Sequence, residues 1–373
     1  MKLAHLTIGV LVSMGMVGAA AAQTPAPCSA ADRAEGNVAM GNRTVLNPAM
    51  NAMTDVPAGS PLAGLPDPYR PDFDWAKMPQ GRTWGDARAI AIDKDGKSIW
   101  VVDRCGPTED GCARNKTINP IMKFDGNGNL VKSFGAGLFS DPHGISVDKD
   151  GNIWTADAKS HGCLDADAPT GNTLRKWSPD GKLLMTISGP QGGKPFTGLT
   201  DVVVSPVTGD IFLGDGHGRV ANDRIIKFDK TGKYLMEWGT PGPAPEQIGI
   251  PHGLAMDKEG RIYVADRTDK AVKVFDQNGK LLHVWTQFGA PSGVYIDKNN
   301  LLYVADETAN MPSNPQLSPG IRIAQVSDGK IIANVPYRPG NALEGVTVDD
   351  AGNIYGANTN HPRAVRWLKT GSL

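Results

Sequence analysis

The sequence predicts an all-β protein folded as a six-bladed β-propeller, and three observations support this fold class. A four-strand pattern recurs six times along the 373 residues. Each copy spans roughly 40–57 residues, the length of one propeller blade. Asp-Gly and Asn-Gly turns separate the alternating apolar runs, which is the usual sequence signal of a β-hairpin. The 45 glycines and 28 prolines also argue against a helix bundle.

Each copy opens with an apolar strand, and a glycine turn leads to the second strand. The first strands are expected at Arg88–Asp93, Gly144–Asp148, Asp201–Ser205, Gly253–Asp257, Gly293–Asp297 and Gly345–Asp349. The second strands end at Asp103, Asp157, Asp215, Asp266, Asp306 and Asn358. Two further strands complete each copy, and in a propeller the first strand lies innermost.

The ring is expected to close by combining the two ends of the chain. The sixth copy ends in Arg363–Leu373, which leaves little chain for a fourth strand. Upstream of the first copy, Arg82–Gly85 matches the fourth-strand endings Ser133–Gly135 and Glu237–Gly239. We therefore expect this N-terminal segment to complete the last blade of a propeller that spans residues 80–373.

The first residues have the pattern of an export signal. Lys2 precedes an apolar run from Leu6 to Val17, and small residues follow up to Ala22. This pattern is typical of a signal peptide at residues 1–22 and is too short for a membrane span. We expect a secreted or periplasmic protein in which residues 23–79 form an irregular arm.

The charge balance restricts the partners that we expect. Lys+Arg total 38 and Asp+Glu total 39, so the formal net charge is −1. Nucleic-acid binding needs an excess of basic residues, which this chain lacks. We expect a monomer that takes a small-molecule or peptide substrate and binds neither nucleic acid nor a membrane.

The four cysteines are expected to meet an oxidising compartment and to form disulfides. Cys105 and Cys112 bracket a short polar loop, which favours a bridge between them and leaves Cys28 with Cys163. Four cysteines allow three pairings, and the spacing alone does not choose among them.

Histidines gather at one mouth of the predicted channel. In a blade, the loop entering the first strand and the loop leaving the second open on the same face. Five of the seven histidines occupy such loops, whereas His283 lies in an outer strand and His5 in the signal peptide. The five are His143, His161, His217, His252 and His361.

One position, just before the first strand, should form a ring around the axis. Its occupants in chain order are Arg88, His143, Thr200, His252, Ser292 and Glu344. His143, His252 and Glu344 come from alternate blades, so the sequence predicts that they hold a metal with one open position. Two imidazoles and a carboxylate suit catalytic Zn²⁺, and Fe²⁺ or Mn²⁺ would also fit. The alternative is that Pro-His-Gly merely opens a strand.

Three further residues are candidates for catalysis at this mouth. Arg104 and Arg267 follow the second strands of blades one and four and could clamp a substrate carboxylate. The alternative is a salt bridge at the rim with Glu307 or Asp269. His217 could act as a general base near the metal, or lie exposed in its loop.

The central part of the chain resembles the peptidyl-α-hydroxyglycine α-amidating lyase domain of peptide-amidating enzymes, and NHL-repeat propellers generally. The similarity covers most of residues 80–365. The motifs that carry it are Pro142–Gly144, Leu199–Gly216, Arg224–Asp229, Gly232–Gly239, Ile250–Met256 and Val264–Arg267. The resemblance implies lyase activity and a six-bladed propeller with an axial Zn²⁺ held by three histidines. It also implies two active-site arginines, a tyrosine base and a structural Ca²⁺.

Some of these functional positions are retained in the sequence. His143 and His252 fall on two of the zinc histidines, and Arg104 and Arg267 fall on the two arginines.

Other positions of that pattern hold different residues here. Glu344 stands at the third histidine, and His217 stands at the tyrosine. Gly345 replaces the calcium-binding aspartate, which leaves Ca²⁺ open. These changes fit a relative that keeps the metal pocket and alters the reaction.

The sequence leaves three functions to separate. The first is a secreted metal-dependent lyase or hydrolase that acts on a small anionic or peptidic substrate. The second is a non-catalytic NHL-type propeller that serves as a binding or scaffold module. The third is a calcium lactonase, which ranks last because its axis would be rich in carboxylates and this one is rich in histidine and arginine.

Overall fold

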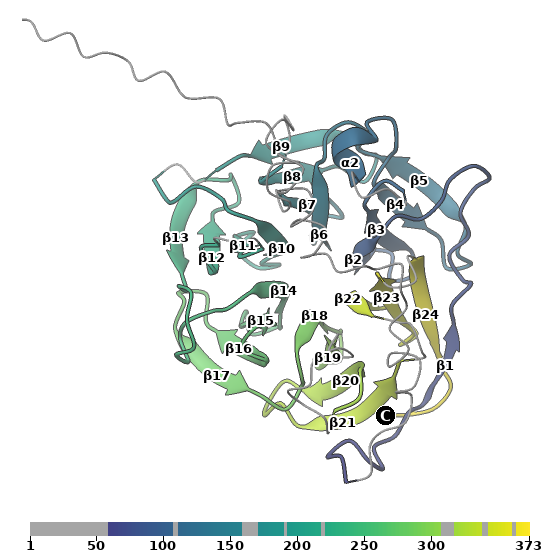
Figure 1. The fold of residues 1–373 in the computed structure, drawn as a ribbon, viewed down its shortest axis with the longest axis vertical. Coiled ribbons are helices and arrows are strands. Elements are labelled where there is room, and N and C mark those ends of the chain that lie inside the picture. The colour runs from purple at the N-terminus through teal and green to yellow at the C-terminus, as the bar shows by residue number, and fades with distance from the viewer. Residues whose placement is uncertain are drawn as a thin grey trace, which may run out of the picture.

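The computed structural model describes residues 59–106, 111–158, 171–189, 192–217, 221–306, 317–337, 342–359 and 363–373. Six four-stranded antiparallel sheets surround a central axis as the blades of a propeller (Figure 1). The predicted fold class is therefore confirmed. The expected signal peptide, Cys28, Cys163, His161, His361 and Glu307 lie outside the described residues.

Every blade has four strands, and in blades one to five the chain runs from the axis outward. Blades one to three are β2(Ala87–Ile92), β3(Ile99–Asp103), β4(Ile121–Phe124), β5(Leu130–Phe134); β6(Asp141–Val147), β7(Ile153–Ala158), β8(Thr173–Trp177), β9(Leu183–Ile187); and β10(Leu199–Val204), β11(Ile211–Asp215), β12(Arg224–Phe228), β13(Tyr234–Trp238). Blades four and five are β14(Pro251–Met256), β15(Ile262–Asp266), β16(Ala271–Phe275), β17(Leu281–Trp285); and β18(Pro291–Ile296), β19(Leu301–Asp306), β20(Gly320–Gln325), β21(Ile331–Pro336). Blade six contains β22(Leu343–Val348), β23(Ile354–Asn358) and β24(Arg363–Lys369).

An N-terminal strand completes the last blade, as the sequence predicts, but it is a different segment. The closing strand is β1(Tyr69–Asp72), which pairs antiparallel with β24 and places Arg366 against Asp72. The propeller therefore includes residues that the sequence assigned to the irregular arm. Arg82–Gly85 instead enters blade one, where the Gly85 N–H donates to Asp103 at 2.6 Å. Gly85 does not adopt the positive φ of Gly135 and Gly239, so the likeness to the fourth-strand endings is one of sequence and not of backbone conformation.

The hydrophobic core lies between the faces of neighbouring blades. At the closure, Trp75 packs against Phe124 of blade one and Tyr355 of blade six, with ring centroids 5.8 and 4.9 Å apart. Such aromatic pairs add to the free energy gained from burial of the rings. The residues after β1 therefore hold the first and last blades together.

A short helix and a disulfide follow blade one's second strand. Cys105 and Cys112 are bonded, which confirms the predicted pairing, and Cys112 lies in α2(Gly111–Arg114). A disulfide of this kind is typical of an oxidising compartment. Within the described ranges, no helix has the length and apolar character needed to cross a membrane.

A fully buried acid or amide ends the second strand of every blade. The set is Asp103, Asp157, Asp215, Asp266, Asp306 and Asn358. Each accepts backbone N–H groups from the loop that enters its first strand. In blade two, Asp157 accepts from Ser140 at 3.1 Å and Asp141 at 2.8 Å, and in blade six Asn358 accepts from Ala342 at 3.1 Å. These bonds fix each entry loop at the mouth of the channel.

Removal of β1 should open the ring. A chain lacking residues 1–73 loses the β1–β24 ladder, whereas one lacking residues 1–58 keeps it. At about 1 kcal/mol for each backbone hydrogen bond, we expect the first chain to lose about 4 kcal/mol of unfolding free energy. Urea unfolding followed by tryptophan fluorescence measures the difference. Equal stability of the two chains would show that β1 contributes nothing to closure.

Candidate functional site

A register shift of the β-bulge type marks the ring position of each blade. Between the first and second strands, the pairing register shifts at Arg88, His143, His252, Ser292 and Glu344, and across Thr200 and Asp201 in blade three. A bulge leaves one residue out of the ladder and redirects its side chain. This irregularity places Arg88, His143, His252 and Glu344 on the axial cavity. In blade three the lining residue is Asp201, whereas the Thr200 hydroxyl donates to the Pro251 carbonyl.

Glycines beside the bulges let the inner strands of adjacent blades approach closely. A Cβ on Gly144 would lie 2.5 Å from the Thr200 carbonyl oxygen, and one on Gly253 would lie 2.7 Å from that of Ser292. Both distances are shorter than a carbon–oxygen contact allows. The Thr200 and Ser292 carbonyls thus reach His143 and His252 because Gly144 and Gly253, which follow these histidines, have no side chain to block the approach.

Those two carbonyls orient the ring histidines. Nδ1 of His143 lies 2.9 Å from the Thr200 oxygen, and Nδ1 of His252 lies 2.9 Å from the Ser292 oxygen. A carbonyl only accepts, so Nδ1 carries the proton and Nε2 has the lone pair. Both Nε2 atoms are buried and have no hydrogen-bond partner among the described residues.

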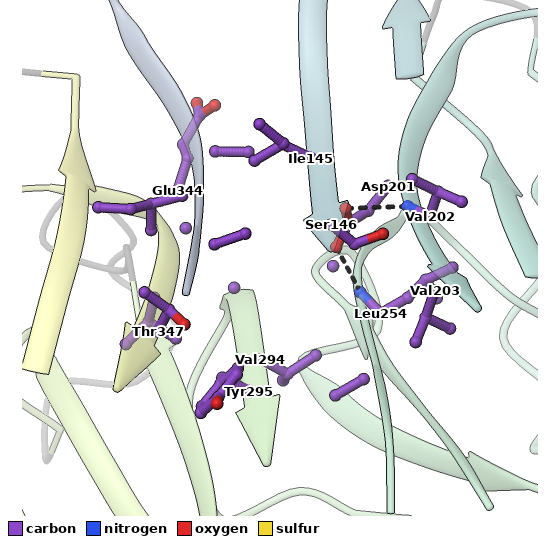
Figure 2. Close-up of a pocket in the computed structure, with 18 of the residues that line it drawn as sticks. Ile145, Ser146, Asp201, Val202, Val203, Leu254, Val294, Tyr295, Glu344 and Thr347 are labelled. Carbon is purple, nitrogen blue, oxygen red and sulfur yellow. Dashed lines mark hydrogen bonds between the residues drawn. The ribbon is translucent and has the colours of Figure 1, made fainter. Parts of the chain in front are cut away.

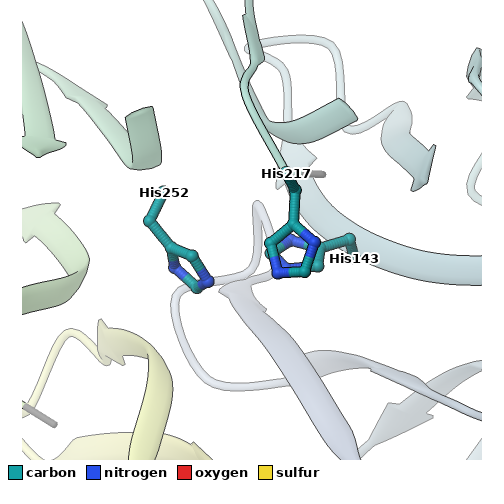
Figure 3. A group of neighbouring side chains, drawn as sticks. All are labelled: His143, His217 and His252. Atoms are coloured by element: carbon teal, nitrogen blue, oxygen red, sulfur yellow. The ribbon is translucent and has the colours of Figure 1, made fainter. Parts of the chain in front are cut away.

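His217 completes a group of three imidazoles. It follows β11 in blade three, between the blades that carry His143 and His252. The ring centroid of His143 lies 4.6 Å from that of His217 and 4.8 Å from that of His252 (Figure 3). One nitrogen from each residue lies within 4.8 Å of the others, a spacing at which one ion can contact all three. Three imidazoles with an open fourth position are a known catalytic zinc set.

Gly198 allows the backbone of His217 to approach closely. The N–H groups of Gly216 and His217 both donate to the Gly198 carbonyl at 2.9 Å. A Cβ on Gly198 would lie 1.8 Å from the His217 oxygen, so only glycine fits. The sequence prediction placed His217 near the metal, and this close contact is the feature that brings it between the other two.

The three imidazoles are held neutral. Burial lowers the pKa of His143 to about 4, although the charge of Glu344 opposes the shift. Burial and the neighbouring histidines lower the pKa of His217 well below its usual value, and burial with Arg267 does the same for His252. Neutral imidazole is the form that binds a metal.

Glu344 lies at the same mouth but has a different partner. Its carboxylate is paired with the guanidinium of Arg88, which also contacts Asp86 at 3.0 Å. Burial would raise the pKa of Glu344, but the positive charge of Arg88 holds it well below its usual range. The three-histidine group does not include Glu344. The predicted ligand role of this residue stays a prediction.

The two predicted arginines have different surroundings. Arg104 is buried, and its Nη2 donates to Asp141 at 2.7 Å, with Asp86 at 3.5 Å. Arg267 is half-buried, and its Nη1 lies 3.5 Å from the hydroxyl oxygen of Ser292. The structure thus places Arg104 in a charge network with Arg88, Asp86 and Asp141 that sequence reasoning missed. Arg88 occupies the same position in its blade as His143, and this was the sequence signal that could have placed an arginine at the mouth.

A cavity of about 180 Å³ lies along the axis and is lined by the inner strands (Figure 2). Arg88, His143, His252 and Glu344 line it where the inner strands begin, and apolar residues such as Ile145, Val202, Leu254, Val294 and Val346 line its middle. Asp201 is the acid within the apolar part. Both of its oxygens accept backbone N–H groups, from Val202 and Leu254 at 2.9 Å each. Burial raises its pKa to about 7.

Comparison with known proteins supports the predicted relationship. Residues 139–164 and 249–275 match the NHL repeat. Peptidylglycine alpha-amidating monooxygenase of Rattus norvegicus is 32% identical over 195 residues, which are 50% of this chain and 18% of that protein. A Caenorhabditis elegans protein named "Probable peptidyl-alpha-hydroxyglycine alpha-amidating lyase" is 33% identical over 208 residues, 51% of this chain and 55% of that protein. The chain thus spans about a fifth of the rat protein and about half of the nematode protein.

A solved structure shares the fold. The gluconolactonase of Xanthomonas campestris superposes with a TM-score of 0.56 at 15% identity, over 85% of this chain and 93% of that one. At this identity the likeness concerns the propeller architecture alone. The chain is therefore a six-bladed propeller with NHL repeats and sequence similarity to proteins named as amidating lyases.

Protonation of the buried histidines should destabilise the metal-free fold. The unfolded chain binds a proton at His143 near pH 6.5, whereas the folded chain binds it only near pH 4. As the pH is lowered from about 6.5 to about 4, the unfolding free energy should therefore decrease, by about 1.4 kcal/mol per pH unit for this residue. Urea unfolding with a chelator at several pH values tests this. His143→Asn should flatten the slope, and exposed His283→Asn should not; a slope unchanged in His143→Asn contradicts the prediction.

Substitution of Gly198 should disturb His217 in particular. Because the added methyl group collides with the His217 backbone, Gly198→Ala is expected to cost about 1–3 kcal/mol of unfolding free energy. Gly189→Ala is the matched control, since a Cβ at Gly189 meets no atom within 4 Å. It should change stability by less than about 0.5 kcal/mol. Equal effects of the two variants in urea unfolding would show that the close approach is unimportant.

Proposed function

We propose that this protein is a secreted, metal-dependent lyase. It cleaves the carbon–nitrogen bond at a hydroxyl-bearing carbon of a small anionic or peptidic substrate at the channel mouth. The observation that carries the proposal is the meeting of three ring nitrogens, with two buried Nε2 atoms lacking a partner in the described part of the chain. The similarity to proteins named as amidating lyases supports this class of reaction.

His143, His217 and His252 are the residues we assign to the metal. Zn²⁺ suits three imidazoles, and Fe²⁺ or Mn²⁺ is compatible with them. The bonds from Nδ1 of His143 and His252 to backbone carbonyls resemble the outer contacts that orient metal-binding histidines. When bound, the metal supplies a Lewis acid for a substrate oxygen. In this assignment His217 takes the ligand role that the sequence suggested for Glu344.

We assign different roles to the two arginines. Arg267 is half-buried beside the histidines, so we assign it to the anionic group of the substrate. Arg104 already pairs with Asp141, and we expect it to position that side of the mouth without binding substrate. The closed loop at Cys105–Cys112 supports export to an oxidising compartment.

Metal content is the first test of this function. Mature protein purified without a chelator or a His-tag should contain about one zinc per chain by inductively coupled plasma mass spectrometry. His143→Ala and His217→Ala should both lose it, because each removes one of three ligands. His283→Ala is the matched control, since this exposed residue of β17 lies in an outer strand, and it should retain the metal.

Turnover separates the enzyme from a binding module. The metal-loaded protein should release glyoxylate and benzamide from N-benzoyl-α-hydroxyglycine, and His143→Ala should release neither above the control. Metal retained in His143→Ala and His217→Ala would overturn the ligand assignment. Protein without transition metal and without turnover would contradict the lyase and favour a non-catalytic NHL propeller that binds its ligand at the same mouth.

A further inference from the structure

One acidic oxygen at the channel mouth is not used by the assignments above. Oε1 of Glu344 is engaged by Arg88, whereas Oε2 is buried and has no hydrogen-bond partner among the described residues. Glu344 as a whole is 6% exposed and lines the same cavity as His143 and His252. An ionised oxygen without a donor is costly in such a place. A ligand that supplies a donor would remove this cost.

The backbone and the neighbouring arginine fix the direction of this oxygen. Glu344 is the bulge residue of β22, so its side chain is directed to the axis. Arg88, the corresponding residue of β2 in the next blade, holds Oε1 and is 3% exposed. Figure 2 shows the carboxylate of Glu344 at the edge of the cavity, away from Tyr295 and Thr347. The carboxylate is therefore held in place before any ligand arrives.

The charge around Glu344 does not favour binding of the substrate carboxylate there. Arg88 and Arg104 bring two positive charges, and Asp86, Asp141 and Glu344 bring three negative ones, so the network has a net charge of −1. Arg267 lies on the side of Ser292, with its Nη1 3.5 Å from the Ser292 hydroxyl oxygen, and its charge also acts on Glu344. A substrate carboxylate therefore fits beside Arg267, and a hydrogen-bond donor fits beside Glu344.

We propose that Oε2 of Glu344 accepts a hydrogen bond from the hydroxyl group of the substrate and thereby selects α-hydroxy compounds over their ethers. Arg88 is the positioning residue that holds the carboxylate in place. This inference rests on the proposed function, because it orients the same hydroxyl-bearing carbon. It assigns Glu344 a contact with substrate and leaves the metal to the three histidines.

Two stable probes that differ only in the donor test the inference. Phenyllactate has an α-hydroxyl group, and its α-methoxy ether lacks the hydrogen. Calorimetry on the metal-loaded protein should show that phenyllactate binds about ten- to a hundredfold more tightly than the ether, the range for a hydrogen bond to a charged group. Glu344→Gln should reduce this preference by about tenfold, because the charge on the acceptor is lost.

The control is Glu237→Gln. Glu237 pairs with Arg224 in the outer part of blade three, so its loss removes a carboxylate–arginine pair of the same kind away from the axis. The preference of the Glu237→Gln variant for phenyllactate over the ether should equal that of the wild type. Metal content is measured on every variant and should be unchanged.

Each outcome distinguishes this inference from the proposed function. A preference that survives Glu344→Gln overturns the contact, and zinc lost from Glu344→Gln overturns it in favour of a ligand role. Purified wild-type protein that contains no metal would overturn the proposed lyase. If that metal-free protein still prefers phenyllactate and only Glu344→Gln loses the preference, the contact between Glu344 and the hydroxyl group is still supported.

A second variant guards against misfolding. Glu344→Gln leaves the buried Arg88 with Asp86 as its remaining ion-pair partner, and the loss of one partner can destabilise the fold. Arg88→Met combined with Glu344→Gln removes both charges and should restore the melting temperature while the preference stays low. A double variant that regains the wild-type preference would overturn the inference.

Discussion

The buried acid or amide at the end of each second strand is the contact on which the site depends. Asp157 shows the principle: its carboxylate takes two backbone N–H groups of the loop that enters β6, and Arg175 contacts it at 3.4 Å. Burial raises its pKa to about 7, and the donors and Arg175 oppose that shift. The same contact in six blades holds six loops at one height around the axis. A functional ring then needs only suitable side chains at one position.

The bulges and glycines convert that scaffold into a site. A regular strand would direct alternate residues to the neighbouring blades. The bulge at His143 removes it from the ladder, and Gly144 lets the Thr200 carbonyl approach its Nδ1. His252 repeats the arrangement one blade away from His217. Orientation of the imidazoles thus follows from backbone geometry, which explains how a repeat fold can hold a defined site.

The mouth combines two electrostatic environments at short range. Three neutral imidazoles face the axis from blades two, three and four, and the ionised pair of Arg88 and Glu344 faces it from blades one and six. The neutral side suits a cation, and the paired carboxylate suits a donor. This division explains why the proposed lyase would hold metal on one side and orient the substrate hydroxyl from the other.

The sequence by itself determined the fold class and the blade order, favoured the Cys105–Cys112 bridge, and located the position before each first strand from which His143, His252 and Glu344 reach the axis. Each depends on local signals, such as hairpin turns, strand periodicity or short loops, that recur in every copy. It misplaced the closing strand because Tyr69–Asp72 has no repeat signal and is a strand only through β24.

Tertiary structure alone decided how the ring residues are grouped. Position in a repeat says which side chains reach the axis, but not which neighbours neutralise them. His217 joins His143 and His252 because Gly198 permits a close backbone contact. Glu344 is drawn to Arg88, 256 residues away in the chain, because the ring brings blade six beside blade one. Such pairings depend on distances across the closed ring, and a linear sequence does not contain them.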